Sequence, residues 1–119
     1  MWHARCVLAA GTAAALATLR VLGAVPDSPS EGTFWGLQVR SGPVSVFEAR
    51  LLVQRDLTVR LGPGRYVLVS FLRQCRENCE SVGPPASRCS APFRVRPGER
   101  LQALVRYRRD GGCVIRFRH

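Results

Sequence analysis

The chain contains no lysine, although 18 of its 119 residues are basic and only 8 are acidic. Every basic residue is therefore arginine, and the formal net charge at pH 7 is +10. A surface selected to bind phosphate would normally use both basic residue types. Exclusive use of arginine in a chain rich in Ala, Gly, Pro and Val is typical of translation from GC-rich DNA, which makes the net charge a weak indicator of a polyanionic partner.

Histidine is also scarce: His3 lies near the start of the chain and His119 ends it. Neither position offers a base for a serine or cysteine nucleophile. The eight carboxylates are scattered, and nothing in their spacing indicates a catalytic pair. Cys75 and Cys79 lack the C-x-x-C spacing of thiol oxidoreductases. We therefore expect a protein that is not an enzyme and has no cofactor; a small secreted hydrolase or a thiol-redox protein is the alternative.

The length allows one domain and is too short for a (β/α)₈ barrel, which needs about 250 residues. Hydrophobic residues make up 46% of the chain and charged residues 22%. This composition is that of a folding chain and not of a disordered one.

No apolar run is long enough to span a bilayer. Residues 1–5 form a short basic start, and the apolar residues 6–19 end at Arg20, which is short of the roughly 20 residues that a spanning helix needs. This pattern predicts a secretory signal cleaved after Gly23 or Ala24, with a buried or amphipathic N-terminal helix as the alternative. The predicted division is a signal peptide at 1–24, a polar leader at 25–32 and a folded domain at 33–119.

Five cysteines become four if residues 1–24 are removed. In a small exported domain, four cysteines indicate two disulfides, for which three pairings exist. We expect Cys75 to pair with Cys113 and Cys79 with Cys89; the alternative joins Cys75 to Cys79 and Cys89 to Cys113. A zinc site or free thiols are further alternatives, but only one close cysteine pair is present, so we expect no metal.

Short runs in which apolar and polar residues alternate follow one another along the chain, separated by turns that contain Gly and Pro. The pattern predicts an all-β protein, a Greek-key β-sandwich of about seven strands. A helix is the alternative for residues 46–54. Residues 65–72 are apolar on both faces and predict a central strand, and residues 73–90 are expected to form a long loop. The expected strands are residues 33–40, 44–54, 56–61, 65–72, 92–96, 101–108 and 113–118.

Two turn motifs resemble those of carboxypeptidase regulatory-like domains, which are transthyretin-type sandwiches with a carbohydrate-binding-like fold. The first is Leu61-Gly62-Pro63-Gly64-Arg65-Tyr66 between two strands, and the second is the turn in residues 93–100. The chain also resembles small exported β-sandwich proteins of high-GC Gram-positive bacteria that carry cysteines in the loop after this first motif. The resemblance implies an accessory or binding module and assigns no ligand residue.

Arginines alternate with apolar residues on the last three expected strands. If these strands share a sheet, the arginines form one outward face, for which a solvated surface is the favoured interpretation and binding of an anionic polymer of the cell envelope is the competing hypothesis. Trp35 is expected in the core, with Phe34 exposed near the leader as a sugar-stacking candidate. The candidate anion-binding residues are Arg94, Arg96, Arg106, Arg108, Arg116 and Arg118.

The sequence thus predicts a module that is secreted or held at the cell surface, is cross-linked by disulfides, and has a binding or structural role. The expected partners are an anionic envelope polymer, a carbohydrate or a protein. Nucleic acid is not expected, because exposed aromatics for base stacking are missing from the basic strands. Contact with a membrane is expected only through an uncleaved signal.

Overall fold

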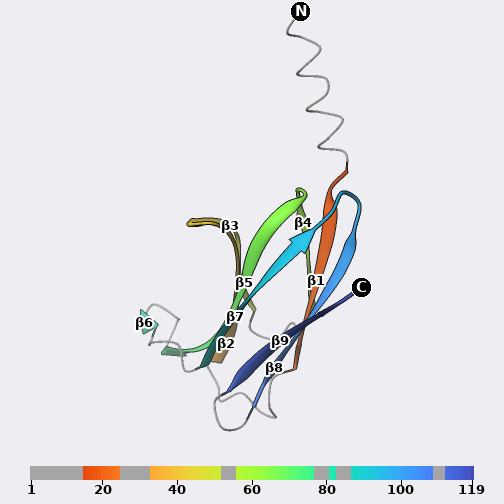
Figure 1. Cartoon of the computed structure of the whole chain (residues 1–119). Helices are drawn as coiled ribbons and strands as arrows, with labels where there is room; N and C mark the ends of the chain where they lie inside the picture. Colours follow the sequence, from red (N-terminus) through yellow and green to blue (C-terminus); the bar gives the residue numbers. More distant parts are fainter. Residues whose placement is uncertain (1–14, 25–32, 52–55, 77–80, 83–86, 109–111) are drawn as a thin grey trace, which may run out of the picture.

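The structure is a computed structural model that describes residues 15–24, 33–51, 56–76, 81–82, 87–108 and 112–119. These residues form nine strands and no helix, which confirms the all-β class (Figure 1). The strands are β1 (Ala17–Ala24), β2 (Thr33–Ser41), β3 (Val44–Leu51), β4 (Asp56–Leu61), β5 (Gly64–Arg76), β6 (Ser81–Val82), β7 (Ser87–Val95), β8 (Arg100–Tyr107) and β9 (Cys113–Arg118).

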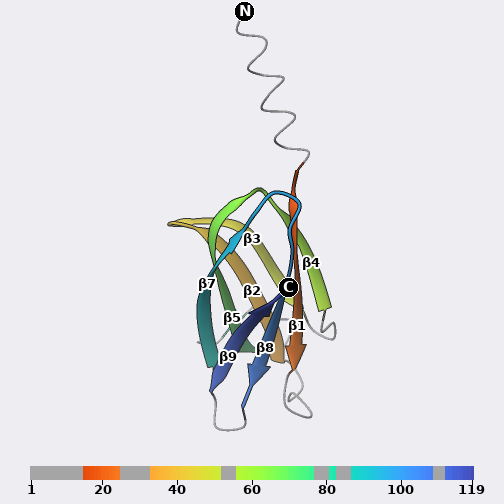
Figure 2. The same ribbon diagram turned by 45° about the vertical axis from the view of Figure 1, so that its right-hand side comes forward.

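The strands form two sheets that lie face to face as a sandwich (Figure 2). One sheet has the order β4-β1-β8-β9; the other runs β3-β2-β5, with β7 and the short β6 both pairing with β5. The chain changes sheet repeatedly, because β2 and β3 belong to one sheet and the flanking β1 and β4 to the other. The strand count exceeds the expected seven because residues 17–24 and 81–82 also form strands.

Period-two alternation explains which side chains enter the core. In β8, Leu101, Ala103, Val105 and Tyr107 are buried while the residues between them are more exposed. The same alternation in the other strands brings their apolar faces together between the sheets. The buried cluster comprises Ala17, Leu19, Val21, Trp35, Leu37, Val39, Leu51, Val59, Leu61, Leu68, Phe93, Val95, Leu101, Ala103, Val105 and Tyr107.

Strand β1 corrects the expected domain boundary. Residues 17–24 were predicted to belong to a cleaved signal segment, but they form an inner strand that pairs antiparallel with β4 and parallel with β8. Leu19 and Val21 of this strand are fully buried. Cleavage after Gly23 or Ala24 would remove β1 and expose the apolar sides of both neighbours, so the sandwich begins at β1 and not at residue 33.

Strand β5 is central in its sheet, as its two apolar faces predicted, and pairs with β2 and β7. It continues to Arg76, and β7 already begins at Ser87. The long loop expected at residues 73–90 is therefore wrong at both ends, because residues 73–76 belong to β5 and residues 87–90 to β7. The alternative helix at 46–54 is wrong, because Val44–Leu51 is the edge strand β3; residues 52–54 lie outside the described part of the chain.

Three aromatic rings connect the two sheets near the Gly62-Pro63-Gly64 turn. The Tyr66 hydroxyl donates to the Gly62 carbonyl oxygen at 2.6 Å, which closes the turn before β5. The Tyr66 ring stacks on Phe93 at 5.6 Å between centroids, and Phe93 lies 5.3 Å from Phe117 on the opposite sheet. The turn motif seen in the sequence thus positions a ring for packing between the sheets.

A series of hydrogen bonds between side chains crosses the apolar interior from one sheet to the other. Trp35 of β2, which is 1% exposed and confirmed in the core, donates from Nε1 to Ser70 Oγ at 2.7 Å. Ser70 Oγ also hydrogen-bonds the Tyr107 hydroxyl from the opposite sheet. Burial raises the pKa of Tyr107 to about 12, although its hydrogen bonds act to lower it. The hydroxyl therefore stays protonated and keeps its place in this series of hydrogen bonds.

Replacing Ser70 by Ala is expected to lower the free energy of unfolding by about 3 kcal/mol, because the buried Trp35 N–H and Tyr107 O–H both lose their partner. Urea unfolding at pH 7 measures the change. Ser90→Ala in β7 is the matched control: Ser90 is exposed, and its substitution should change stability by less than about 0.5 kcal/mol. Equal effects of the two substitutions would contradict the role given to Ser70.

Candidate functional site

A disulfide joins the two sheets at one side of the sandwich. Cys89 of β7 bonds Cys113 at the start of β9, with 5.4 Å between their Cα atoms. These strands are edges of different sheets, so the bond closes the side where no backbone pairing connects them.

The preferred pairing of cysteines is therefore wrong for these two residues, and the alternative bond between Cys89 and Cys113 is confirmed. The reason is that β7 begins before Cys89, which places this residue in a strand facing β9 and not in a loop. Cys79 lies outside the described residues, and for Cys75 the structure gives only its backbone pairing with Val82. A second bridge between Cys75 and Cys79 stays a prediction.

The six arginines expected to share a face are all exposed, but they are divided between the two sheets. Arg94 lies on β7 and Arg96 directly follows it, whereas the other four lie on or next to β8 and β9. The single face was predicted on condition that the three strands share a sheet, and β7 does not share one with β8 and β9. The prediction of one face formed by all six arginines is therefore wrong.

The outward side of the four-stranded sheet nevertheless collects six exposed arginines. Thr18 of β1 pairs with both Arg60 and Arg100, so these flanking arginines lie on one side of the sheet. We call this surface the arginine face, and it consists of Arg20, Arg60, Arg100, Arg106, Arg116 and Arg118.

One acidic side chain occupies an outward position among the described residues of these four strands. Arg20 holds this residue, Asp56, with two nitrogens, the shorter contact being 2.6 Å. The hydrogen bond to Arg20 lowers the pKa of Asp56, and the same bond raises that of Arg20. Arg118 donates from Nε to Gln102 at 2.9 Å. The arginine face therefore carries six positive charges against one negative charge.

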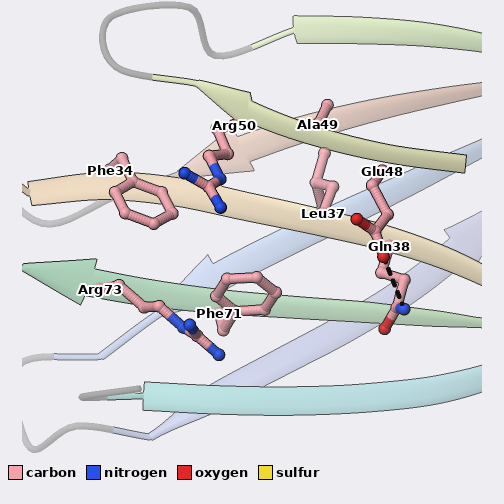
Figure 3. Close-up of a pocket in the computed structure, with 8 residues that line it drawn as sticks. All are labelled: Phe34, Leu37, Gln38, Glu48, Ala49, Arg50, Phe71 and Arg73. Carbon is pink, nitrogen blue, oxygen red and sulfur yellow. Dashed lines mark hydrogen bonds between the residues drawn. The ribbon is translucent and has the colours of Figure 1, made fainter. Parts of the chain in front are cut away.

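The opposite side of the molecule carries a separate hollow of about 420 Å³. It lies on the outer surface of the five-stranded sheet, over β2, β3 and β5 (Figure 3). Phe34 and Phe71 meet edge to face at 6.5 Å between ring centroids. The guanidinium carbon of Arg50 lies 5.5 Å from the centre of Phe34, and that of Arg73 lies 4.8 Å from the centre of Phe71. We call the whole hollow, which also includes Gln38 and Glu48, the arginine–phenylalanine pocket.

Gly36 explains the position of the Phe71 ring. The two residues are directly opposite in the β2–β5 ladder, and a Cβ on Gly36 would lie 2.1 Å from Phe71 Cε2. The ring therefore covers the backbone of Gly36 and reaches Phe34. Phe34 is only 2% exposed, so the expectation of an exposed Phe34 is wrong: its outward position is covered by Phe71 and Arg50.

Hydrogen-bonding groups lie at the other end of the hollow. Glu48 Oε1 accepts from Gln38 Nε2 and from Ser45 Oγ, both at 3.1 Å. The Nε–H group of Arg73, in contrast, is buried and has no hydrogen-bond partner in the described part of the chain. The pocket thus presents arginine donors at one end and a carboxylate at the other (Figure 3).

The sequence pattern did not indicate this pocket. Arg50 and Arg73 stand at outward positions of their strands, but they are 23 residues apart and come from different strands. Their meeting depends on the pairing of β2 with both β3 and β5. One feature of the sequence could have indicated the pocket: Phe34 and Phe71 each occupy an outward position in an otherwise apolar strand.

Comparisons with protein-family models, with curated proteins and with solved structures find no match for this chain. Within the described ranges, no helix has the length and apolar character needed to traverse a bilayer. In the same ranges, His, Cys, Asp and Glu side chains form no group of three or more that could hold a metal ion.

The bond between Cys89 and Cys113 is expected to stabilise the folded protein by about 3 kcal/mol, because it closes a loop between residues 24 positions apart. A Cys89→Ser, Cys113→Ser double variant should lose this amount in denaturant unfolding. Tryptic mapping of the unreduced protein should recover one peptide pair joined through these residues. Recovery of Cys89 linked to Cys79 would contradict the structure.

Proposed function

We propose that the chain is an exported, non-enzymatic binding module that holds an anionic polymer of the cell envelope against its arginine face. The observation that supports this proposal is the collection of six exposed arginines with one acidic residue on the outward side of a single sheet.

The geometry of a sheet suits an extended polyanion. Neighbouring strands are about 4.8 Å apart, and alternate residues on one strand are separated by about 6.8 Å. Arg116 and Arg118 are such alternate residues on β9, and Arg106 and Arg100 lie on the adjacent β8. Cations at these spacings would repel one another, and a chain of carboxylates or phosphates would offset the repulsion.

Half-buried apolar side chains lie between the arginines. Leu22 and Leu104 are register neighbours of β1 and β8, and Val114 lies on β9. This strip gives the face a place for the apolar part of a ligand, such as the C–H groups of a sugar ring or a polyol. A polymer that alternates such groups with anions fits this face better than an inorganic ion does.

The described carboxylates favour binding over catalysis because they lie apart and are engaged. Asp56 is held by Arg20, and Glu48 accepts from Gln38. Glu99 accepts from the backbone N–H of Arg96 at 2.8 Å, and its other carboxylate oxygen lies 2.9 Å from His119 Nδ1. No two of the three form a catalytic pair in the described structure.

Export requires a leader that ends before or at the start of β1. Ala15 and Ala17 supply small residues at positions −3 and −1 of a cleavage between Ala17 and Thr18. This cleavage removes the hydrogen bond from the Gly98 N–H to the Ala15 carbonyl, but the new terminal ammonium of Thr18 can keep its bond to the Glu99 carbonyl at 2.8 Å. The cleavage also removes the buried Ala17, but residues 18–24 keep their pairing with β4 and β8, so the sandwich can retain this part of β1 after processing.

Binding to an immobilised polyanion should depend on the arginine face and weaken with salt. Replacing Arg100, Arg106, Arg116 and Arg118 by Gln should reduce affinity about tenfold or more at about 50 mM NaCl, since four exposed contacts contribute a few tenths of a kcal/mol each. Binding of the unmodified protein should fall steeply by about 500 mM NaCl. Poly-L-glutamate and poly(glycerol phosphate) serve as the two probes and distinguish carboxylate from phosphate ligands.

The matched control replaces four arginines on the outward side of the other sheet, namely Arg40, Arg65, Arg88 and Arg94, by Gln. Both variants lose the same net charge. If the two variants bind the polymers equally, the arginine face has no special role. If salt leaves binding unchanged, the interaction is not electrostatic, and the proposal fails.

The exported protein is expected to begin at Thr18. Expression of the full chain in a secreting Gram-positive host, followed by N-terminal sequencing of the medium and cell-surface fractions, measures this terminus. A folded product that begins after Gly23 or Ala24 would contradict the placement of β1. An intact, reduced chain confined to the cytosol would contradict export.

A further inference from the structure

We propose that the arginine–phenylalanine pocket is a second ligand site that binds a hexuronate, that is, a sugar ring bearing a carboxylate. The pocket lies on the outer surface of the five-stranded sheet, whereas the arginine face belongs to the other sheet. The inference therefore stands independently of the proposed polymer binding.

The two arginines are positioned in advance for an anion. Each guanidinium lies over a phenylalanine ring, at 5.5 Å for Arg50 on Phe34 and at 4.8 Å for Arg73 on Phe71. A guanidinium that lies over an aromatic ring can keep its in-plane N–H groups for hydrogen bonds. Two parallel N–H donors match the two oxygens of a carboxylate. The rings thus hold the donors at little further entropic cost when a ligand binds.

Arg73 supplies an independent indication of a ligand. Its Nε–H group is buried without a partner among the described residues, and such groups are rare because leaving one unpaired costs about 1–3 kcal/mol. Because the atom is covered in the structure, a ligand oxygen would satisfy this donor after a shift of the Arg73 side chain in the pocket.

The opposite end of the pocket restricts the ligand further. Glu48 and the carbonyl of Gln38 offer acceptor oxygens, and Glu48 repels a compact anion such as phosphate. The ligand therefore needs a carboxylate at one end and hydroxyl donors at the other. Between them the exposed part of Phe71 provides an apolar surface for C–H groups. The volume of about 420 Å³ lies within the range of small-molecule sites, and a hexuronate ring meets all of these requirements.

Calorimetric titration of the full chain with sodium D-glucuronate tests this inference. D-glucose lacks the carboxylate, acetate lacks the hydroxyls, and N-acetyl-phenylalanine represents a peptide carboxyl terminus. We expect glucuronate to bind at least about tenfold more tightly than each of the other three. Equal or tighter binding of glucose or acetate, or a preference for N-acetyl-phenylalanine, would overturn the ligand class. No heat of binding up to about 10 mM glucuronate would overturn the site.

Variants then assign the binding to the pocket. Arg50→Gln and Arg73→Gln should each weaken glucuronate binding about tenfold, and Arg73→Lys should weaken it as well, since lysine keeps the charge but lacks the Nε–H group and the planar stack. Arg65→Gln is the matched control, because Arg65 is an exposed outward arginine of the same strand. Unchanged binding in the Arg50 and Arg73 variants, or an equal loss in the Arg65 variant, would overturn the inference.

The failure of this site and the failure of the polymer-binding proposal are distinguishable. The fourfold Gln variant of the arginine face should bind glucuronate normally. The Arg73→Gln variant should retain binding to poly(glycerol phosphate). Loss of glucuronate binding in the arginine-face variant would place the ligand on that face and overturn the pocket assignment.

Discussion

The parallel pairing of β1 with β8 is the constraint on which most of the structure depends. Strand β1 lies between β4 and β8, and its buried residues Leu19 and Val21 form part of the core. Its outward residues connect the arginines of β4 with those of β8, so the arginine face exists only because β1 joins those strands. The core and the charged surface are therefore linked through one ladder of hydrogen bonds.

The sheets are connected by two specific links in addition to apolar contact. The hydrogen bonds of Ser70 with Trp35 and Tyr107 cross the interior, and the bond between Cys89 and Cys113 joins two edge strands. Apolar packing alone tolerates small sliding of one sheet over another, whereas these directional links do not. They restrict the relative position of the sheets, and with it the separation of the two arginine-bearing surfaces on opposite sides of the molecule.

Local patterns predicted the strands well and their partners poorly. Alternation located the strand at residues 56–61, the central run at 65–72 and the turn after Leu61, because each depends on residues close in sequence. It did not reveal that residues 17–24 are a strand, since a short apolar run behind a basic start is equally typical of a signal. The start of β7 at Ser87 was also missed, because the polar residues before Pro92 do not alternate clearly, and the disulfide partners were assigned wrongly as a consequence.

The sequence alone determined the all-β class, the inward position of Trp35 and the outward position of the arginines, since each follows from the period of two that every strand obeys. The tertiary structure decided which arginines share a surface, which cysteines bond, and that two phenylalanines and two arginines from three strands form a pocket. These outcomes depend on sheet order and register between distant segments. Many pairings bury similar apolar area, and only packing of the whole chain selects among them.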